Sequence, residues 1–588
     1  MNVQLSGEES SLPSPSMKAF LRSEVPRLTM VRASLIAAMV VVVLAGVVGA
    51  APGKGQRGAV ATVHPLASEA AIQAMQSGGN AVDAAVAAGL TLGVVDGFNS
   101  GVGGGCFMVI RRADGSVVAI DGREKAPDAA TRDMFVRDGK GDSRLSQTGA
   151  LAIGVPGSLA VYDHAIRSYG KLSLRQHLLA AAEIAEKGFP LSRTYVQRLA
   201  SAADELRGFE SSRAIFLNAD GSPLVPGTML RQQDLARSYR VMAEQGIAWF
   251  YGGAFADQTA SWIKSHGGIA TAQDFRKYDF KLREPIRTTY RGHEIVGFPP
   301  PSSGGLHVAQ ILNVLEQFDL KRMGVNSADF VHVVTEAMKL AFADRAYWLG
   351  DPDFVPVPRG LVAKEYGAKL AKRIDMRRAS PVPKHDTPER ADTDVFGKHT
   401  THFSCADAEG NWVACTATVN TTFGSKVVIP GTGIVMNNQM DDFSIQPGVA
   451  NAFGLLGAEA NAVAPGKRPL SSMSPTIVLK DGKPILSIGA AGGPTIISQT
   501  LLALLHVIDF GSAADEALAQ PRFHHQWRPD ELRVEKKMTE SVRMELSKRG
   551  HRVVVTESMG AAQAVAIDRS GGLAGVADPR GEGSGVAR

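Results

Sequence analysis

Three clusters of threonine lie within one short stretch of the chain, at 400–401, 416–418 and 421–422. A threonine hydroxyl is a poor nucleophile unless a base lies beside it, and the α-amine of an N-terminal threonine can be that base. A free α-amine has a pKa of about 8, which suits catalysis near neutral pH. A threonine in mid-chain reaches this state only if the bond before it is cut. The stretch is therefore consistent with nucleophilic catalysis by threonine, or with an ordinary threonine-rich strand.

The residues before this stretch bear on that choice. Residues 355–399 are rich in Pro, Lys, Arg and Asp and have weak hydrophobic periodicity, which predicts an exposed linker. A solvated linker that ends at Thr400, followed at once by an alternating strand, is the arrangement that a cut before the threonine needs. The pattern alone leaves both interpretations open.

Other patterns that could do chemistry are absent or incomplete in the sequence. The glycines of GVGGGCF (101–107) lack the third glycine of a phosphate-binding loop and precede a strand, so we interpret them as a site of close backbone packing. His524 and His525 are adjacent, and on a strand they point to opposite faces, so they cannot bind one ion together. No H-E-x-x-H, paired Cys-x-x-Cys or G-x-S-x-G motif occurs in a suitable context. We expect no catalytic metal and no other cofactor.

Composition excludes several other classes of function. The chain has 588 residues, of which 44% are hydrophobic and 21% charged, as is typical of a globular protein. The net charge of +5 is small for this length and no basic block is interleaved with aromatics, so we expect no nucleic-acid partner. The three cysteines, Cys106, Cys405 and Cys415, are odd in number and do not suggest a disulfide scaffold; we expect buried thiols.

The first fifty residues differ from the rest of the chain. After a polar stretch, Arg32 precedes an apolar run that ends with Val48 and Ala50 at the −3 and −1 positions. This pattern predicts a secretory signal over residues 1–50, and Met30 offers an alternative start. Because the run approaches a membrane-spanning length, a retained anchor is the other interpretation. We expect an exported protein, periplasmic or extracellular, with a membrane contact only if this segment is retained.

The predicted elements indicate a layered α+β fold. Two alanine-rich helices separated by Gly78–Gly79, with Asn80 as the cap of the second, precede a hairpin that delivers Arg123 to a loop. Residues 150–350 are mostly helical by periodicity, and after Thr400 three hairpins alternate with helices at 495–509, 512–519 and 539–550. Hairpins with helices grouped around them fit a sheet sandwich covered by helices.

Several long motifs, in order, resemble one family. TTHFSCADAEGNWVACTATVNTTFG, MNNQMDDFS, ANAVAPGKRPLSSMSPT, AAGG and PRFHHQWRPDELRVE resemble the small subunit of γ-glutamyltranspeptidases. GGNAVDAAVAA, IDGREKAP, PPPSSGG and EAMKLAFADRAYWLGDPDF resemble the large subunit, and the resemblance runs from about Val60 to Pro579. It implies a four-layer αββα sandwich of the N-terminal nucleophile hydrolase type. It also implies self-cleavage between His399 and Thr400, which gives a large subunit 51–399 and a small subunit 400–588.

The resemblance also implies a role for each matching residue. Thr400 would attack the γ-amide carbonyl of glutathione or another γ-glutamyl donor, for transfer to water or to an amino-acid or peptide acceptor. Thr418 would hydrogen-bond this nucleophile, and Gly492 and Gly493 would form the oxyanion hole. The remaining matches concern the donor: Arg123, Ser471 and Ser472 would bind its α-carboxylate, and Asp442, Asn420 and Gln439 its α-amine.

The sequence departs from the family pattern near the expected site. Ala490–Ala491 stands where Ser-Pro is common, Pro494 replaces a small polar residue, and Phe453 in the covering loop 445–458 replaces a tyrosine. These changes bear on acceptor choice and loop closure. The alternatives are a glutaryl-type cephalosporin acylase, whose substrates lack the α-amine that Asp442 would bind, and an exported binding protein without activity.

Overall fold

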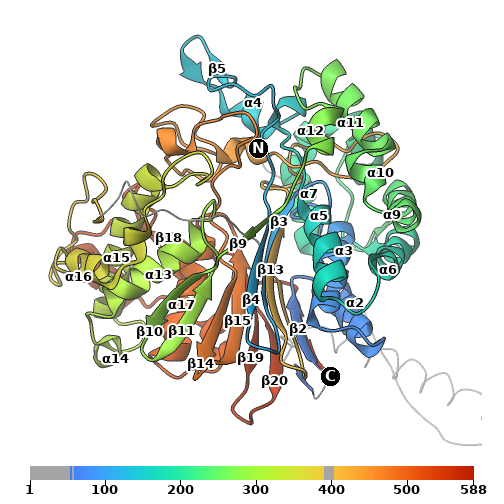
Figure 1. Ribbon diagram of the computed structural model, residues 1–588. Helices are drawn as coiled ribbons and strands as arrows, with labels where there is room; N and C mark the ends of the chain where they lie inside the picture. The colour runs from blue at the N-terminus through green and yellow to red at the C-terminus, as the bar shows by residue number, and fades with distance from the viewer. Residues whose placement is uncertain (1–52, 56–57, 390–402) are drawn as a thin grey trace, which may run out of the picture. The chain divides into compact units, whose positions relative to one another are not determined.

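Two seven-stranded sheets lie against each other in the part of the chain that the structure describes (Figure 1). The structure is a computed structural model that describes residues 53–55, 58–389 and 403–588, all within the compact unit 50–588. The signal expected over residues 1–50 and the cleavage site expected at His399 and Thr400 lie outside these residues. Among the described helices, none is both long and apolar enough to span a membrane.

The first sheet contains the hairpin of residues 403–418. In spatial order its strands are β21 (Ser584–Ala587), β2 (Gly58–Thr62), β12 (Phe403–Asp407), β13 (Trp412–Thr418), β3 (Gly105–Arg111), β4 (Val117–Gly122) and β9 (Lys281–Arg283). All neighbours are antiparallel. Phe403 faces Cys415, so Cys405 lies opposite Val413. All three cysteines are buried free thiols, as predicted.

The second sheet contains the hairpin that leads to the glycine pair. Its strands, in order, are β1 (Gly53–Gly55), β20 (Leu573–Ala577), β19 (Ala561–Ile567), β15 (Lys483–Ala491), β14 (Thr476–Lys480), β11 (His293–Gly297) and β10 (Ile286–Tyr290). Smaller sheets join β16 (Phe523–His524), β17 (Leu532–Glu535) and β18 (Val553–Thr556); β5 (Val136–Arg137) and β6 (Lys140–Gly141); and β7 (Phe189–Pro190) and β8 (Met229–Leu230).

A thin apolar layer joins the two large sheets. Phe107 of β3 stacks on Phe298 with ring centroids 4.9 Å apart, and both side chains are fully buried. The hydroxyls of Ser404 and Ser487 lie 3.0 Å apart across the same layer. Because most other side chains here are Ala, Val and Ile, the sheets approach closely and hold β13 beside β15. That contact brings the ends of these two strands to one place.

Helices cover the outer face of the first sheet. Those on this side are α2 (Pro65–Gln76), α3 (Ala81–Val95), α5 (Ser158–Tyr169), α6 (Leu174–Lys187), α7 (Arg193–Arg207), α8 (Glu210–Phe216), α9 (Gln233–Gln245), α10 (Ala248–Tyr251), α11 (Ala254–Ser265) and α12 (Ala272–Arg276). The short helix α4 (Ser143–Gln147) lies beside β5 at the top of Figure 1 and contacts the 3₁₀ turn η1 (Ala150–Ala152). As predicted, Asn80 caps α3, and Asp83 completes the capping box. Every residue of α3 is buried, which fits its alanine-rich sequence.

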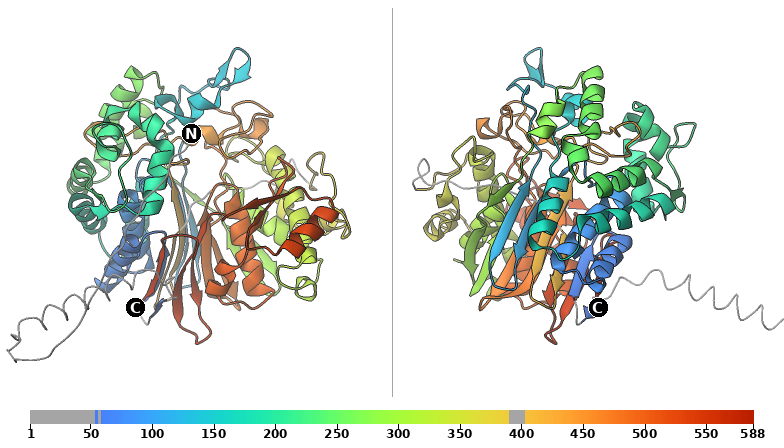
Figure 2. Two further views of the ribbon diagram at one scale, coloured as in Figure 1. Left: turned by 180° about the vertical axis from the view of Figure 1, so that it is seen from behind. Right: turned by 45° about the vertical axis from the view of Figure 1, so that its right-hand side comes forward.

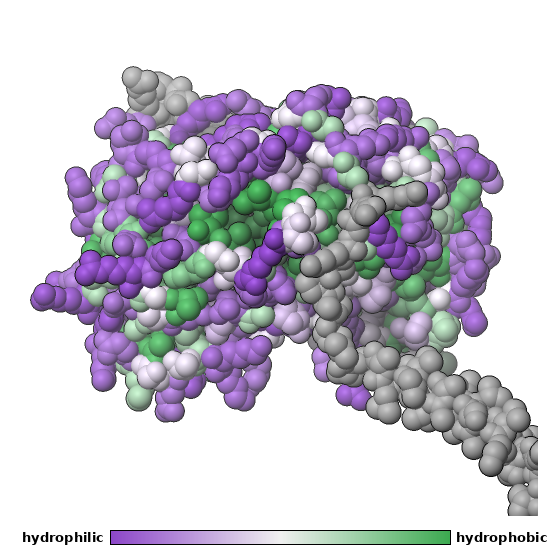
Figure 3. All heavy atoms as spheres, turned by 90° about the horizontal axis from the view of Figure 1, so that it is seen from below, coloured by the Kyte–Doolittle hydropathy of each residue, from purple (hydrophilic) through white to green (hydrophobic). Residues whose placement is uncertain are grey.

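The second sheet carries its own helical layer. It consists of α13 (Gly304–Leu315), α14 (Leu320–Met323), α15 (Ala328–Trp348), α16 (Lys364–Ala371), α17 (Thr495–Ile508), α18 (Ala514–Ala519) and α19 (Glu540–Lys548), and the remaining 3₁₀ turns are η2 (Arg359–Val362), η3 (Gln439–Asp442) and η4 (Glu459–Asn461). The rear view shows the same layers, helix, sheet, sheet, helix (Figure 2). Seen from below, hydrophobic residues gather in a band between hydrophilic rims (Figure 3). The predicted α+β, four-layer αββα sandwich is confirmed.

Residues 150–350 are mostly helical, as predicted, but the strands at 281–297 were not anticipated. These residues form β9, β10 and β11, and the side chains of 286–290 alternate between buried and exposed. This period of two was present in the sequence, but long helices on both sides obscured it. The linker expected over 355–399 is not exposed throughout, because it contains α16, and Leu361 and Leu370 are fully buried.

Candidate active site

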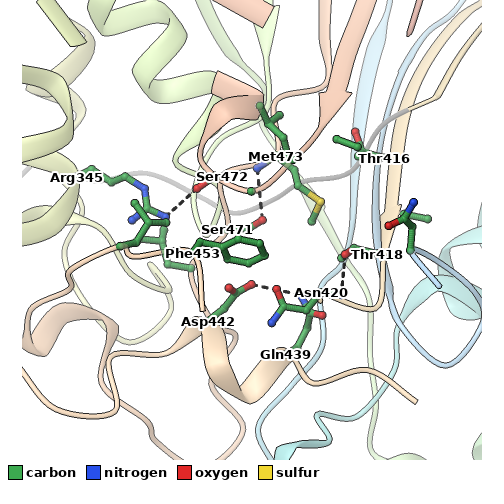
Figure 4. Close-up of a pocket in the computed structure, with 18 residues that line it drawn as sticks. Arg345, Thr416, Thr418, Asn420, Gln439, Asp442, Phe453, Ser471, Ser472 and Met473 are labelled. Atoms are coloured by element: carbon green, nitrogen blue, oxygen red, sulfur yellow. Dashed lines mark hydrogen bonds between the residues drawn. The ribbon is translucent and has the colours of Figure 1, made fainter. Parts of the chain in front are cut away.

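A cavity of about 90 Å³ lies where β13 and β15 end (Figure 4). Its lining combines residues from widely separated parts of the sequence. Eight of the predicted site residues line it: Thr418, Asn420, Gln439, Asp442, Ser471, Ser472, Gly492 and Gly493. The fold therefore brings into one cavity residues that were each predicted separately from the sequence.

Thr418 ends β13 and faces this cavity. Its hydroxyl oxygen accepts a hydrogen bond from the backbone N–H of Asn420 at 2.8 Å, which leaves its own proton free to be donated. A Cβ atom at Gly104 would lie 1.9 Å from the carbonyl oxygen of Thr418, so only glycine permits this approach of β3. The interpretation of the 101–107 glycines as a close backbone contact is confirmed, and its effect is to fix the end of β13.

The glycine pair forms the turn between β15 and α17. Gly492 has a φ of 128° and Gly493 a φ of 58°, values that favour glycine. No described residue accepts a hydrogen bond from either amide N–H. Both amides lie beside the first turn of α17, whose macrodipole favours negative charge. The pair can therefore stabilise an oxyanion in the cavity.

Asp442 is the acidic group of the cavity. Its Oδ2 accepts hydrogen bonds from Nη2 of Arg123 at 2.5 Å and from Nε2 of Gln439 at 3.3 Å, whereas no described residue donates to Oδ1. Burial raises the pKa of Asp442, and the charge of Arg123 opposes this rise. Burial also raises the pKa of the adjacent Glu124 to about 8. Asp442 thus has one oxygen fixed by the protein and one available to a cationic ligand.

Arg123 lies behind Asp442 rather than in the cavity lining. Its side chain is 1% exposed, and its other hydrogen bonds go to the carbonyl oxygens of Pro469 and Leu470 and to Glu124. Through these contacts Arg123 holds Asp442 in position. Its predicted role in binding the substrate stays a prediction.

Sequence reasoning missed Arg345 of α15. Its Nη2 donates to the hydroxyl of Ser472 at 3.0 Å and its Nε to the hydroxyl of Ser303 at 2.9 Å. Ser303 in turn donates to the carbonyl oxygen of Ser471 at 2.7 Å. Burial lowers the pKa of Arg345 to about 10, so it remains charged at neutral pH. Its place within the motif EAMKLAFADRAYWLGDPDF was the signal that could have identified it.

The loop 445–458 covers the cavity. Phe453 and Leu455 are among the lining residues, and the ring of Phe453 packs against Gly493. The side-chain amide of Gln526 donates to the carbonyl oxygen of Gly454 at 3.1 Å, and Asp441 accepts from the N–H of Ala452 at 2.9 Å. Hydrogen bonds at Ala452 and Gly454 therefore hold the tip of this loop on both sides of Phe453.

A larger cavity of about 470 Å³ adjoins the first. The residues common to both linings are Asn99, Asn420, Phe453, Ala491, Gly492 and Gly493. The outer cavity adds Asp96, Tyr195, Arg198 and Glu582. Asp96 accepts from the side chain of Asn99 at 3.0 Å, and burial raises its pKa to about 8. A second substrate could reach the glycine pair from this side.

Within the described residues, one group has metal-ligand geometry. Ligand atoms of His332, Glu336 and His551 lie within 4.8 Å of one another. The two histidines, however, hydrogen-bond each other at 2.7 Å, and Glu336 accepts from the ammonium of Lys339 at 2.9 Å. These residues do not line the cavity at the glycine pair, and each already has a protein partner.

Comparisons with known proteins agree with this geometry. The sequence model of the family described as Gamma-glutamyltranspeptidase matches residues 67–587. A glutathione hydrolase proenzyme of Escherichia coli (strain K12) is 45% identical over 532 residues, which cover 90% of this chain and 91% of that protein. Among solved structures, a cephalosporin acylase from Bacillus halodurans has a TM-score of 0.81 at 28% identity, covering 92% of this chain and 97% of its own.

A solved γ-glutamyltranspeptidase from Helicobacter pylori is 38% identical with a TM-score of 0.53, and it covers 57% of this chain and 93% of its own. The Helicobacter pylori chain matches only 57% of this chain but 93% of its own length, as one of two subunits would. The Escherichia coli relative is named a proenzyme, which also fits a precursor that gives two subunits. The family model covers most of the chain, and a relative at 45% identity is matched over nine-tenths of its length. This chain therefore belongs to the γ-glutamyltranspeptidase family.

Proposed function

We propose that this protein is a self-cleaving γ-glutamyltranspeptidase and glutathione hydrolase. It moves a γ-glutamyl group from glutathione or another γ-glutamyl amide to water, an amino acid or a peptide. The observation that carries the proposal is a single cavity lined by the Gly492–Gly493 amides, Thr418 and Asp442. Acyl transfer needs donors for an oxyanion, support for a hydroxyl nucleophile and a charge that positions the substrate.

Activation is cleavage between His399 and Thr400, which yields subunits 51–399 and 400–588. In the described hairpin β13, which ends at Thr418, pairs with β12, which begins at Phe403, three residues after the proposed nucleophile. The Thr418 hydroxyl then hydrogen-bonds the nucleophile, and the new α-amine of Thr400 takes its proton.

The reaction then follows in two steps. The Thr400 oxygen attacks the γ-carbonyl carbon, and the developing oxyanion is stabilised by the amides of Gly492 and Gly493. The leaving amine takes a proton from the Thr400 ammonium, and a γ-glutamyl ester remains. Water or an acceptor amine attacks the carbonyl carbon of this ester and gives a proton to the same α-amine. The bond between this carbon and the Thr400 oxygen then breaks, and the α-ammonium returns the proton to that oxygen.

Donor recognition uses the two charged groups on the glutamyl α-carbon, the α-amine and the α-carboxylate. Asp442 binds the α-amine through Oδ1, with Asn420 and Gln439 beside it, and Ser471 and Ser472 bind the α-carboxylate. Arg123 matches the arginine that binds this carboxylate in the family, and here it also fixes Oδ2 of Asp442. Neither charge takes part in the bond that breaks, so these contacts position the γ-carbonyl.

The acceptor reaches the ester from the outer cavity. That cavity is larger than the first and shares the glycine pair with it, so an amine can approach the acyl group while the glutamyl part stays bound. Its lining has an acidic and a basic group, Glu582 and Arg198, which suits a zwitterionic amino acid or peptide.

The acylase alternative has the same fold, as the Bacillus halodurans structure illustrates. The carboxylate of Asp442 favours the γ-glutamyl donor, because a glutaryl donor has no amine to pair with a buried carboxylate. Export, with removal of residues 1–50, completes the proposal. N-terminal sequencing of the large subunit tests it, and a start upstream of Ala33 on membrane-bound material would indicate a retained anchor.

The experiment compares purified wild type with Thr400→Ala on a denaturing gel and with a γ-glutamyl anilide. We expect two subunits and anilide release from the wild type, and a single chain without activity from the variant. Release that is faster with glycylglycine identifies transfer, and release without it identifies hydrolysis. An uncut chain with full activity, or a small subunit that starts at another residue, would contradict the proposal.

A further inference from the structure

The covering loop 445–458 rests on a buried side-chain amide. Gln526 is 7% exposed, and its Nε2 faces three backbone carbonyl oxygens, those of Phe453 at 3.3 Å, Gly454 at 3.1 Å and Arg528 at 3.4 Å. A Cβ atom at Gly454 would lie 3.4 Å from this nitrogen, so the loop is in direct contact with the amide. Because a carbonyl oxygen can only accept, Gln526 donates its amide protons to the tip of the loop.

His524 fixes the orientation of that amide. Burial lowers the pKa of His524 to about 3, so its ring is neutral and carries one N–H. With Nε2 of Gln526 turned toward the loop, Oε1 lies 3.1 Å from Nε2 of His524 and accepts this N–H. Nδ1 of His524 then accepts from the hydroxyl of Ser498, 2.8 Å away. Ser498, His524 and Gln526 together form the loop clamp.

The loop clamp begins on α17. Ser498 is in the first turn of this helix, which follows Gly492 and Gly493 in the chain. The clamp therefore connects the helix behind the glycine pair with the tip of the covering loop. The neighbouring His525 is not part of it, because its Nε2 pairs with Asp530 at 3.0 Å. The two adjacent histidines, which were not expected to bind one ion, thus have separate partners in the protein.

Phe453 is the residue that the loop clamp holds in place. Its ring packs against Gly493, and in the close-up it projects into the cavity (Figure 4). Within the loop 445–458, Phe453 is the residue that lines both the inner and the outer cavity, so it forms part of the wall between them. The members of the loop clamp line neither cavity. Any effect of the clamp on the reaction therefore passes through Phe453.

We infer that Gln526 and His524 are positioning residues for the donor, because they hold the covering loop closed with Phe453 against Gly493. The kinetic part of this inference rests on the proposed function, whereas the hold on the loop can be measured without a substrate. When the clamp is released, the loop must close as the donor binds. The apparent affinity for the donor then falls by the fraction of molecules in which the loop is closed.

Two variants release the clamp, and each has a matched control. Gln526→Met keeps a side chain of similar length without an amide, and Gln232→Met is its control, at a buried glutamine that donates to the carbonyl oxygen of Val94 at 2.8 Å. His524→Phe keeps a ring without the N–H. Its control is His506→Phe, at a fully buried histidine whose ring nitrogens have no hydrogen-bond partner among the described residues.

Hydrogen–deuterium exchange at residues 452–455 reports opening of the loop. The four backbone amides of this segment all donate hydrogen bonds within the protein, so they exchange when the loop opens. We expect Gln526→Met to speed their exchange at least about fivefold, as for loss of buried hydrogen bonds. His524→Phe should cause a smaller increase, because Gln526 keeps its amide but not its orientation. Both controls should follow the wild type.

Steady-state kinetics with a γ-glutamyl anilide tests the effect on the donor. For Gln526→Met, KM should rise at least about threefold while kcat changes less than about twofold, since the released loop closes again once the donor is bound. His524→Phe should change KM in the same direction, and the two controls should leave it unchanged. The split between KM and kcat distinguishes positioning of the loop from general loss of stability.

Unchanged exchange at 452–455 in Gln526→Met would overturn the inference. An equal rise in Gln232→Met would overturn it too, because the effect would then not depend on the clamp, and so would faster exchange with an unchanged KM. If a variant does not process, the exchange comparison is made between uncut chains that all carry Thr400→Ala. A wild type that turns over no γ-glutamyl donor would contradict the proposed function, while the exchange result would still decide whether the clamp holds the loop.

Discussion

The packing around Gly493 leaves no room for a side chain beside the cavity. A Cβ atom there would lie 2.5 Å from Cδ1 of Phe453, and the φ of 58° is unfavourable for other residues. We expect Gly493→Ala to lower kcat for the γ-glutamyl anilide by at least about tenfold, because the proposed oxyanion donor and the covering loop must both move. Steady-state kinetics of the processed variant measures the effect.

Gly482 provides the matched control. Its φ is 73° in the turn between β14 and β15, and a Cβ atom there would meet nothing within 4 Å. Gly482→Ala therefore has a similar backbone cost, about 1 kcal/mol, without contact with the cavity. It should lower the thermal midpoint slightly and leave kcat unchanged. A similar loss of kcat in both variants would show that backbone strain, and not the site, explains Gly493→Ala.

Asp442 is a second test at the scale of one residue. Asp442→Asn removes the charge proposed for the substrate amine and leaves Arg123 without its carboxylate, and loss of one partner of such a pair costs about 2–5 kcal/mol. We expect kcat/KM for the γ-glutamyl anilide to fall at least about tenfold, and the preference over a glutaryl donor to narrow. Self-cleavage should survive, because it needs no free amino acid. Unchanged discrimination between the donors would contradict the assigned role.

At the scale of elements, α15 is tied to the loop between α19 and β18 through buried histidines. His332 of α15 hydrogen-bonds His551 at 2.7 Å and the carbonyl oxygen of Asp375 at 2.8 Å. Burial, with the neighbouring His332, lowers the pKa of His551 from 6.5 to about 3. The folded state then binds fewer protons than the unfolded state between these values, so the free energy of unfolding falls as the pH falls from 6.5 toward 3.

His551→Gln should weaken this dependence. The variant cannot take up the proton, so its thermal midpoint should fall less than that of the wild type between pH 6.5 and pH 4.5. Thermal melts at several pH values measure the difference. His266→Gln, at an exposed histidine, is the control and should follow the wild type. Parallel curves for His551→Gln and wild type would mean that other groups dominate the acid response.

At the scale of the whole molecule, the two predicted subunits share both large sheets. In the first sheet β13 pairs with β3 along its entire length, and β12 pairs with β2. In the second, β14 pairs with β11. A cut between His399 and Thr400 therefore leaves a continuous hydrogen-bonded core, and separation of the chains would expose both sheets.

We expect the processed protein to remain one particle. Size-exclusion chromatography without denaturant should give a single peak with the elution volume of Thr400→Ala, while a denaturing gel of that peak should show two chains. Moderate salt should not separate them, because the contact is mainly apolar and hydrogen-bonded, and salt screens buried ion pairs such as Arg123–Asp442 only weakly. Recovery of separate folded subunits without denaturant would contradict this arrangement.

Local residue patterns were enough to predict the α+β class, most elements and the candidate residues. Capping and turn signals act over a few positions, so Asn80 and the three late hairpins could be predicted from local residues. The long motifs were enough to indicate the family, because several of them in one order are specific together. The strands of 281–297 and α16 were missed, since weak local signals there depend on burial against distant elements.

The contacts among the site residues could not be predicted, because they depend on how distant segments pack. Arg123 and Asp442 are 319 positions apart, and the sequence contains no sign that they pair with each other. Arg345 and Ser472 are 127 positions apart, and their contact depends on how α15 packs beside the loop before β14. The acceptors around Arg123 and Arg345, and the burial of both side chains, arise only when distant segments pack together.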